Sequence, residues 1–357
     1  MTSILINVAK KLIPRSGIIK IKKLQAFFTE LSLRLWVYSK WTSWLYYSIV
    51  SKAFWREQYG VIYGKLKFYE NLKLGKDSNF LLRRNIHRLE KGLIMKPRRN
   101  IFAITYIENT LNLYEKALAV RDKNGTLELQ WAHDVLKQYF SVVGFHPIID
   151  PLKTKFFSFQ AINGETQFVP YKRDPSILPP VNYEQFMELS IRRRSVRWYL
   201  QKPVPRELID KAIMAATLSP SACNRQPFEF RIFDDSEMVQ KVAAIPMGTA
   251  GFHHNFPAII VVIGKLRAYV SERDRHVIYI DASLASMTFM YALETLGLSS
   301  CPINWPDLDP QESQMTSLIN LEPDERVVML ISVGYYDPEG MIPYSQKKPL
   351  NQIRRYC

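Results

Sequence analysis

The sequence predicts an α+β fold in which helices pack around one antiparallel or mixed sheet. Helix and strand patterns alternate from Asn182 onward. Residues 257–263 form a continuous apolar run rich in β-branched side chains, which is typical of a buried strand. Residues 280–296 are apolar almost throughout and too long for one strand, so they predict a helix in the core or in a subunit interface.

The other elements of this half follow from local signals. Asn182 and Pro205 suit the starts of two helices, because Asn caps helices and Pro fits a first helical turn. Beyond residue 217, several runs of four to eight residues have the apolar patterns of strands. The predicted elements are helices over 182–193 and 205–217 and strands over 227–233, 299–303 and 326–333, which with 257–263 make four strands.

The first 182 residues predict helices and a proline-rich connection. Residues 101–120 carry a periodic apolar pattern, and a turn at Asn124-Gly125 precedes a helix that Thr126 caps and that runs to about Val143. Six prolines between residues 147 and 180 break any helix there, so we expect a linker or a surface arm. The predicted division is a helical extension over 1–146, a linker over 147–182 and a sandwich domain over 183–357.

Charge is distributed unevenly along the chain. The 357 residues include 48 Lys and Arg against 33 Asp and Glu, a net charge of +15, and 47% are hydrophobic, enough for a sizeable core. Residues 1–100 alone hold 21 basic and 5 acidic side chains, and the rest of the chain is nearly neutral. The basic segment and the neutral body therefore need separate explanations.

Residues 1–70 combine this charge with aromatic side chains. Fourteen aromatic residues lie between Leu24 and Tyr69, and apolar residues from Leu24 to Leu35 recur at helical spacing. We favour a helix that packs these aromatics on the body or on a second subunit. The alternative is an interfacial helix, peripheral at the inner face of the membrane, whose lysines meet anionic lipid. Nucleic-acid binding is not expected, because no recognised nucleic-acid motif accompanies the charge.

Several classes of protein are not expected. Three widely spaced cysteines argue against a disulfide framework and for the cytoplasm. The chain start lacks the charged and apolar regions of a signal peptide, and no apolar run reaches the ~20 residues of a membrane span. No Cys, His and carboxylate set has metal-site spacing, and neither a GxGxxG after a strand nor a Walker loop is present.

Four stretches of the second half carry polar residues that the fold does not require. Guanidinium groups and a serine at 192–197 suit a phosphate, because Arg binds its oxygens bidentately. Small residues and prolines at 219–227 form a tight loop with uncharged donors and acceptors, which suits a planar heterocycle. Residues 297–305 place backbone at a strand edge, and two lysines within 344–350 could meet the same phosphate.

In this order, these stretches resemble the nitroreductase-like flavoprotein family over residues 183–354. The most specific features are the paired motifs Arg-Arg-Ser-x-Arg at 193–197 and Ser-Pro-Ser-Ala-x-Asn-Arg-Gln-Pro at 219–227. The resemblance implies a three-layer sandwich and an obligate homodimer with one FMN at each of two interface sites. It also implies alternating (ping-pong) reduction by NADH or NADPH and reoxidation by a small organic acceptor, with hydride transfer at flavin N5.

The resemblance also implies which residues meet the cofactor. A fixed cation near flavin N1 and O2 stabilises the negative charge that reduction brings. By this resemblance, the phosphate and ribityl chain would meet Arg193, Arg194 and Ser195, the phosphate would also meet Lys347, and the N1 and O2 edge would meet Arg197. The ring and ribityl chain would be lined, partly from the second subunit, by Ser219, Pro220, Ser221 and Asn224. The ring would also pass Pro302, Ile303 and Asn304, and the Asn304 backbone N–H would face N5.

Two departures from the family pattern affect the acceptor side. Asn304-Trp305 stands where many relatives carry Glu or Gly after Pro-Ile, and Trp305 would narrow the substrate pocket. The family position that places an Asn near the flavin is open here among Thr249, Gly251 and His254. For Cys223 and Cys301 we favour the role of small buried hydrophobic residues, which is common for free cysteine. The alternative is a redox role near the flavin.

The motif at 83–93 in the first half resembles the N-terminal extension of a nitroreductase-like subgroup often encoded beside surface-polysaccharide genes. His87, Glu90 and Lys91 share one helical face, and Gly92 can end the helix. We favour a salt-bridged helix end. The alternative is that His87 and Lys91 reach the flavin pocket of their own or the partner subunit and select an anionic acceptor.

The expected function is that of an FMN-dependent oxidoreductase that uses NADH or NADPH, with the flavin as catalyst and no metal. An alternative within the enzyme class is a flavin-dependent dehydrogenase or reductase of a biosynthetic intermediate, for example in a polysaccharide pathway. An alternative outside that class is a membrane-surface or nucleic-acid-binding module that keeps a flavin fold for structure.

Overall fold

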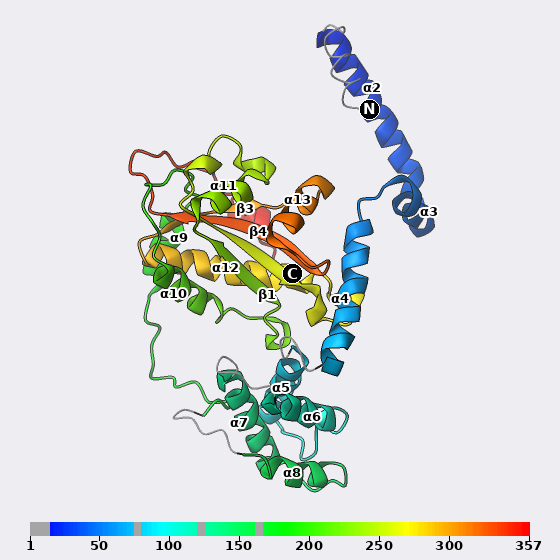
Figure 1. Cartoon of the computed structure of the whole chain (residues 1–357), viewed down its shortest axis with the longest axis vertical. Helices are drawn as coiled ribbons and strands as arrows, with labels where there is room; N and C mark the ends of the chain where they lie inside the picture. The colour runs from blue at the N-terminus through cyan, green and yellow to red at the C-terminus, as the bar shows by residue number, and fades with distance from the viewer. Residues whose placement is uncertain (1–14, 75–79, 120–125, 161–166) are drawn as a thin grey trace. The chain divides into compact units, whose positions relative to one another are not determined.

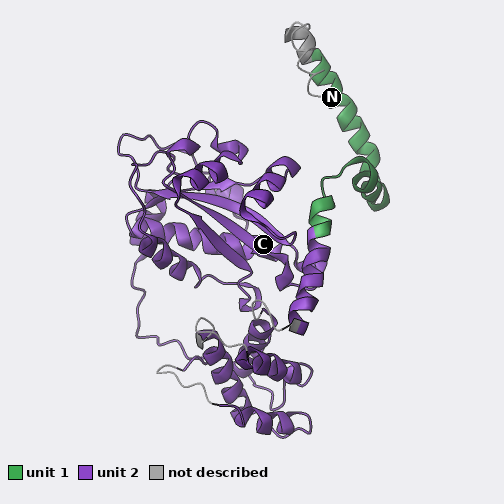
Figure 2. Ribbon diagram, in the orientation of Figure 1, with its two compact units in different colours: residues 1–59 green, residues 60–357 purple. Residues whose placement is uncertain are grey.

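The computed structural model of the chain describes residues 15–74, 80–119, 126–160 and 167–357 (Figure 1). The chain forms two compact units, Met1–Tyr59 and Gly60–Cys357 (Figure 2). The three-part division predicted from the sequence stays a prediction, and the expected turn at Asn124-Gly125 lies outside the described residues.

The second unit contains a four-stranded antiparallel sheet, which confirms the predicted α+β class. The strand order is β1-β2-β4-β3. All four predicted strands are present, with bounds within two residues of those expected from the sequence. They are β1 (Phe228–Phe233), β2 (Ala258–Lys265), β3 (Ser299–Asn304) and β4 (Glu325–Gly334).

Helices cover both faces of the sheet and make three layers (Figure 1). Alternate residues of β2 enter the two apolar cores, because successive side chains of a strand point to opposite faces. Ile259 and Val261 pack with α11 (Ser236–Ala244) and α13 (Asp309–Ile319). Ile260 and Val262 pack with α10 (Arg206–Ala216) and α12 (Val277–Thr295). Burial on both faces explains the continuous apolar run of β2.

The predicted helices of this domain are confirmed. Asn182 caps α9 (Tyr183–Arg192): its Oδ1 accepts from the Gln185 backbone N–H at 2.8 Å, while the Gln185 side chain accepts from the Asn182 N–H. Pro205 directly precedes α10. The remaining short elements are α14 (Leu350–Ile353) and the 3₁₀ turns η2 (Ala222–Asn224), η3 (Met247–Thr249), η4 (His253–Asn255), η5 (Leu266–Ala268) and η6 (Glu272–Asp274).

Four helices before the sandwich form a separate apolar core within the same unit. They surround a group of fully buried aromatic side chains. The helices are α5 (Phe80–Leu93), α6 (Ile107–Ala119), α7 (Thr126–Val142) and α8 (Ile149–Phe157), and the aromatic residues are Tyr114, Tyr139, Phe140 and Phe156. The predicted helix from Thr126 is confirmed.

Three expectations for this region are wrong. The helix expected from residue 101 begins at Ile107, because Ala103 adopts a left-handed φ of 65° that a helix does not accommodate. A helix, α8, lies within the proline-rich segment, because Pro151 stands in its first turn, where no backbone N–H is needed. Gly92 lies inside α5 rather than ending it. A Cβ at Gly92 would come within 2.3 Å of the Phe102 ring, so close packing requires the glycine.

The first unit consists of helices with exposed apolar side chains. It contains α2 (Arg15–Trp36), which confirms the helical spacing of its apolar residues, α3 (Lys40–Leu45), the π-helix η1 (Tyr46–Val50) and the start of α4 (Trp55–Leu74). No residue from Lys20 to Tyr59 is buried. Among the described helices, none is both long and apolar enough to cross a membrane.

Candidate flavin site

The arginine motif after α9 is fixed at the β3 edge of the sheet. Arg193 leaves the helix in an extended conformation, and Ser195 forms an isolated parallel bridge with Ser300. The Val196 N–H donates to the Ser300 carbonyl at 3.1 Å. Backbone pairing therefore brings the first and third predicted stretches together.

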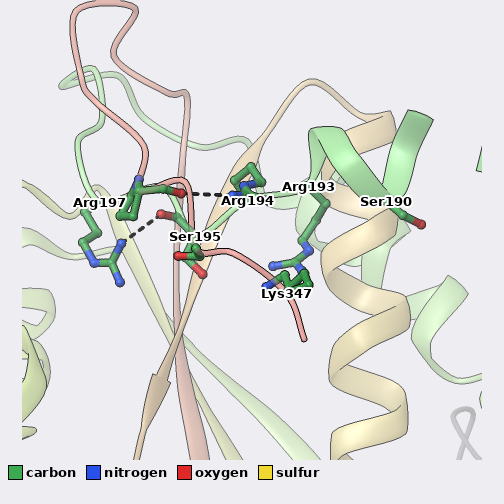
Figure 3. Close-up of a pocket in the computed structure, with 8 residues that line it drawn as sticks. Ser190, Arg193, Arg194, Ser195, Arg197 and Lys347 are labelled. Atoms are coloured by element: carbon green, nitrogen blue, oxygen red, sulfur yellow. Dashed lines mark hydrogen bonds between the residues drawn. The ribbon is translucent and has the colours of Figure 1, made fainter. Parts of the chain in front are cut away.

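A cationic cavity of about 110 Å³ opens beside this motif (Figure 3). Figure 3 shows the Arg193 side chain extending toward Lys347, which comes from the C-terminal stretch. Arg194 tethers that stretch by donating to the carbonyls of Pro343, at 3.0 Å, and Tyr344. The lining residues include four cations and no carboxylate: Ser190, Arg193, Arg194, Ser195, Arg197, Pro343, Ser345 and Lys347.

The residues of this cavity fit a phosphate group. The Arg193 Nε is buried and has no hydrogen-bond partner among the described residues. Buried donors are usually paired, so this N–H could donate to a ligand oxygen. Arginine and lysine donors together with three serine hydroxyl groups match the oxygens and charge of a phosphate ester. The first and fourth stretches thus meet, although the roles of their residues toward a cofactor stay predictions.

Arg197 is positioned by a residue that the sequence did not single out. The buried Asn255 accepts from the Tyr199 N–H and donates to the Arg197 carbonyl, both at 2.9 Å. The guanidinium of Arg197 donates to the Ser195 carbonyl at 3.2 Å and lies 5.7 Å from the centre of the Phe252 ring. Asn255 directly follows the two histidines, and only its place just before β2 could have drawn attention to it.

The three residues left open near this point have separate surroundings. Thr249 is fully buried, and its hydroxyl donates to the Ala243 carbonyl at 2.6 Å. Gly251 has a φ of +92°, and the His254 ring lies 5.9 Å from that of Trp198. None of these contacts assigns a flavin role to one of them.

The loop over 219–227 is held by a buried carboxylate. Asp281 of α12 accepts from the Ser221 hydroxyl at 2.7 Å and from the Ala222 N–H at 2.9 Å. Burial raises the pKa of Asp281, while these hydrogen bonds act against that rise. Asp281 is the sole carboxylate in the first four turns of an otherwise apolar helix, a signal that could have been used.

Three consecutive or near-consecutive loop residues adopt left-handed backbone conformations. Cys223, Asn224 and Gln226 have φ values of 55°, 51° and 52°. Such conformations cost free energy for residues with a Cβ and cluster at functional sites, where surrounding contacts enforce them. Ser221 supplies one of these contacts, because its Oγ accepts from the Gln226 N–H at 2.7 Å. The Ser219 hydroxyl bonds to that of Thr288 at 2.7 Å.

The cavity and the loop lie at diagonally opposite corners of the sheet. Ser300, beside the cavity, pairs with Val333 on β4, whereas Phe228, directly after the loop, aligns through Gly264 with Arg326 on β4. The seven-residue step from Arg326 to Val333 on β4 covers about 23 Å along the strand. The three strand spacings from β3 to β1 add about 14 Å across the sheet. One protomer therefore does not bring the two predicted halves of the site together.

The end of β3 presents the third predicted stretch. Asn304 is exposed at the strand end, Ile303 is buried and Pro302 is half-buried. Trp305 is 8% exposed in the core, and its indole N–H donates to Glu312 at 2.6 Å, so its role in a substrate pocket rests on the resemblance alone. All three cysteines are free, and burial raises the pKa of the Cys301 thiol, which disfavours the reactive thiolate.

The helical extension contacts the 219–227 loop through Arg83, not through His87 or Lys91. Arg83 donates from Nε to the Asn224 carbonyl at 2.8 Å and from its terminal nitrogen to the Gln226 side chain at 3.1 Å. His87 instead pairs with Glu90 at 3.1 Å, as the salt-bridged interpretation requires, and Lys91 is exposed. No described group of His, Cys and acidic residues could hold a metal ion.

Comparisons with known proteins agree with this architecture. The nitroreductase family model matches residues 191–250 and 239–335. A protein of Archaeoglobus fulgidus, named for NADH dehydrogenase and NAD(P)H nitroreductase, is 33% identical over 43% of this chain and 86% of its own length. Iodotyrosine deiodinase 1 of Pongo abelii is 26% identical over 47% of this chain and 67% of its own.

Among solved structures, an FMN-dependent nitroreductase from Clostridium difficile is 26% identical, with a TM-score of 0.41, over 47% of this chain and 98% of its own. The fold and site define an α+β domain with a cationic cavity at one corner of its sheet. The chain belongs to the nitroreductase family, whose members are oxidoreductases.

Proposed function

We propose that this protein is an FMN-dependent oxidoreductase that takes hydride from NADH or NADPH and delivers it to a small organic acceptor in alternating steps. The observation that carries the proposal is the cavity lined by four cations, one of which, Arg193, has a buried Nε without a partner among the described residues. FMN, when bound, supplies an atom that accepts and returns a hydride. The protein supplies binding, orientation and fixed charge.

Each part of the site has a defined task in this proposal. Arg193, Arg194, Ser195 and Lys347 hold the phosphate. Arg197 provides the fixed cation near N1 and O2, and Asn255 keeps its backbone in place. At the exposed end of β3, the Asn304 N–H is the proposed donor to N5, with Pro302 and Ile303 beside the ring. Ser219, Pro220, Ser221 and Asn224 line the ring from the loop.

The separation of the two corners supports a homodimer. A cofactor held in the cavity of one protomer is too far from the loop of that protomer to touch it, by the strand geometry above. We therefore propose that the loop of one subunit faces the cavity of its partner, so that two sites form at one interface. This arrangement is symmetric, as most homodimers are.

The proposal is tested by the absorbance of the purified protein and by chromatography of the cofactor that denaturation releases. We expect a yellow protein that releases FMN, and oxidation of NADH or NADPH when an acceptor is added. Nitrobenzene derivatives and iodotyrosine are suitable acceptors, since relatives are named for both chemistries. A colourless protein that does not take up added FMN would contradict the proposal. A biosynthetic intermediate as acceptor would leave it intact.

A second proposed function concerns the first unit, which we propose binds an anionic membrane surface. Residues 15–59 contain eight basic and two acidic side chains. Large side chains of α2 and α3 are exposed among them, including Phe27, Phe28 and Trp41 at 60%, 58% and 76%. Exposed aromatics and cations on the same helices suit the headgroup layer of an anionic bilayer.

We expect the protein to sediment with vesicles of phosphatidylglycerol and phosphatidylcholine and much less with phosphatidylcholine alone. A Trp41→Ser, Trp44→Ser double variant should lose most of this binding, because it removes two exposed indoles. A variant with Trp198→Ser, in the second unit, is the control. Equal binding to both vesicles, or self-association that buries the same side chains without lipid, would contradict the proposal.

A further inference from the structure

Three arginines near the 219–227 loop have no role in the phosphate cavity. Arg84 and Arg88 lie one turn apart on α5 and so on one helical face. Arg225 belongs to the loop itself, to which Arg83 docks the same helix. All three are half-buried. The helix contact therefore gathers cations from two segments more than a hundred residues apart in sequence.

Two of these guanidinium groups are stacked on tyrosine rings. Arg88 lies 3.7 Å from the centre of the Tyr106 ring, and Arg225 lies 4.5 Å from that of Tyr269. Stacking fixes the plane of a guanidinium and leaves its N–H edge available for an anion. The Arg225 Nε is buried without a hydrogen-bond partner among the described residues. Two of the three arginines are thus held in place by tyrosine rings, and one buried donor of Arg225 has no partner in the described part of the chain.

No described carboxylate forms an ion pair with any of the three. The neighbouring Arg83 differs, because it lies 3.5 Å from Glu128. Asp281 is near enough to Arg225 to influence its charge, but no ion pair joins them among the described residues, and Asp281 Oδ2 accepts from both Ser221 and Ala222. Burial, followed by the charges of Arg225 and Arg88, lowers the pKa of Arg84. Half-buried like charges without a counterion are unfavourable, and an anion between them would relieve the repulsion.

We propose that Arg84, Arg88 and Arg225 bind the oxyanion of the electron acceptor, a carboxylate or a phosphate group. The site lies beside the loop that would line the flavin ring and away from the corner that would hold the flavin phosphate, so this inference rests on the proposed function. A bound oxyanion would keep the rest of the acceptor at the ring. In this proposal Arg84, Arg88 and Arg225 select an anionic acceptor, the role that we considered above for His87 and Lys91.

The test compares 4-nitrobenzoate with 4-nitrobenzamide, which share the ring and nitro group but differ in charge. Calorimetric titration of the full-length protein without NADH or NADPH gives the dissociation constant of each. We expect the wild type to bind the benzoate more tightly. Arg84→Gln and Arg225→Gln should each weaken benzoate binding about tenfold, as loss of a charge-assisted hydrogen bond does. Binding of the benzamide should stay within about twofold.

Arg273→Gln is the matched control, because Arg273 influences Arg84 but is 83% exposed and lies 3.6 Å from Asp274. Its benzoate binding should change little. Equal wild-type binding of the two compounds, or an equal loss in Arg273→Gln, would overturn the inference. So would a loss of NADPH binding alone, which would assign the arginines to the nucleotide. Flavin content is measured separately, so a protein without FMN contradicts the proposed function, while the titration still decides the arginine site.

Discussion

Asp324→Ala is expected to lower the free energy of unfolding by about 3 kcal/mol, since breaking a buried ion pair strands the remaining charge. Asp324 is fully buried, and its two oxygens accept from Nε and a terminal nitrogen of Arg267, each at 2.7 Å. Glu322 and Glu325 lie 3.4 and 3.5 Å from Arg267, so in the variant they would neutralise the Arg267 charge only in part. Denaturant unfolding followed by circular dichroism measures the change.

The chain contains a matched control for this prediction. Asp234 binds Arg206 with the same two-pronged geometry, at 2.6 and 2.9 Å, but the side chains are 28% and 76% exposed. Water solvates either charge when the other is removed, so Asp234→Ala should change stability little. Similar losses in the two variants would show that burial does not decide the value of the Asp324 pair.

Arg193→Ala is expected to weaken FMN binding about tenfold to a hundredfold, the usual effect of losing a hydrogen bond to a charged group. The buried Arg193 Nε has no partner in the part of the chain that the structure describes, and Lys347 lines the same cavity (Figure 3). Dissociation constants for FMN, from titration of the flavin-free protein followed by fluorescence, measure the effect. Arg193→Gln removes the charge and the Nε donor but keeps an amide donor, so it should weaken binding less than Arg193→Ala.

Arg192→Ala is the neighbouring control. The Arg192 side chain is 60% exposed, lies 3.5 Å from the buried Glu294 and is not among the residues that line the cavity. This variant should keep its FMN affinity, although the loss of a partner for Glu294 can lower its melting temperature. Equal FMN affinity in Arg193→Ala and the wild type would remove Arg193 from the phosphate site.

The elements of the sandwich could be predicted because their signals are local. Asn182 caps the helix that directly follows it, so it predicts where that helix begins. The apolar run of β2 predicts a strand that is buried on both faces. Proline predicted the structure less well, since its effect depends on position: Pro151 stands in the first turn of α8 and does not prevent the helix. The late start of α6 follows from the backbone at Ala103, and alanine gives no sign of a left-handed conformation.

The candidate site could be predicted only in part, because the rest depends on contacts between distant segments. Motif residues such as Arg193 and Lys347 were identified and do meet in one cavity. Asn255 and Asp281 were missed, since each acts by holding the backbone of another segment. Arg83 contacts a loop 141 residues away, and no spacing rule within one helix predicts such a contact.

The diagonal placement of cavity and loop has a genetic consequence. If each site takes its cavity from one subunit and its loop from the other, a chain with a defective cavity and a chain with a defective loop are each inactive alone. Mixed in one dimer, they pair the two lesions in one site and leave the second site complete. Two inactivating alleles would then restore activity together, with at most one working centre in each mixed dimer.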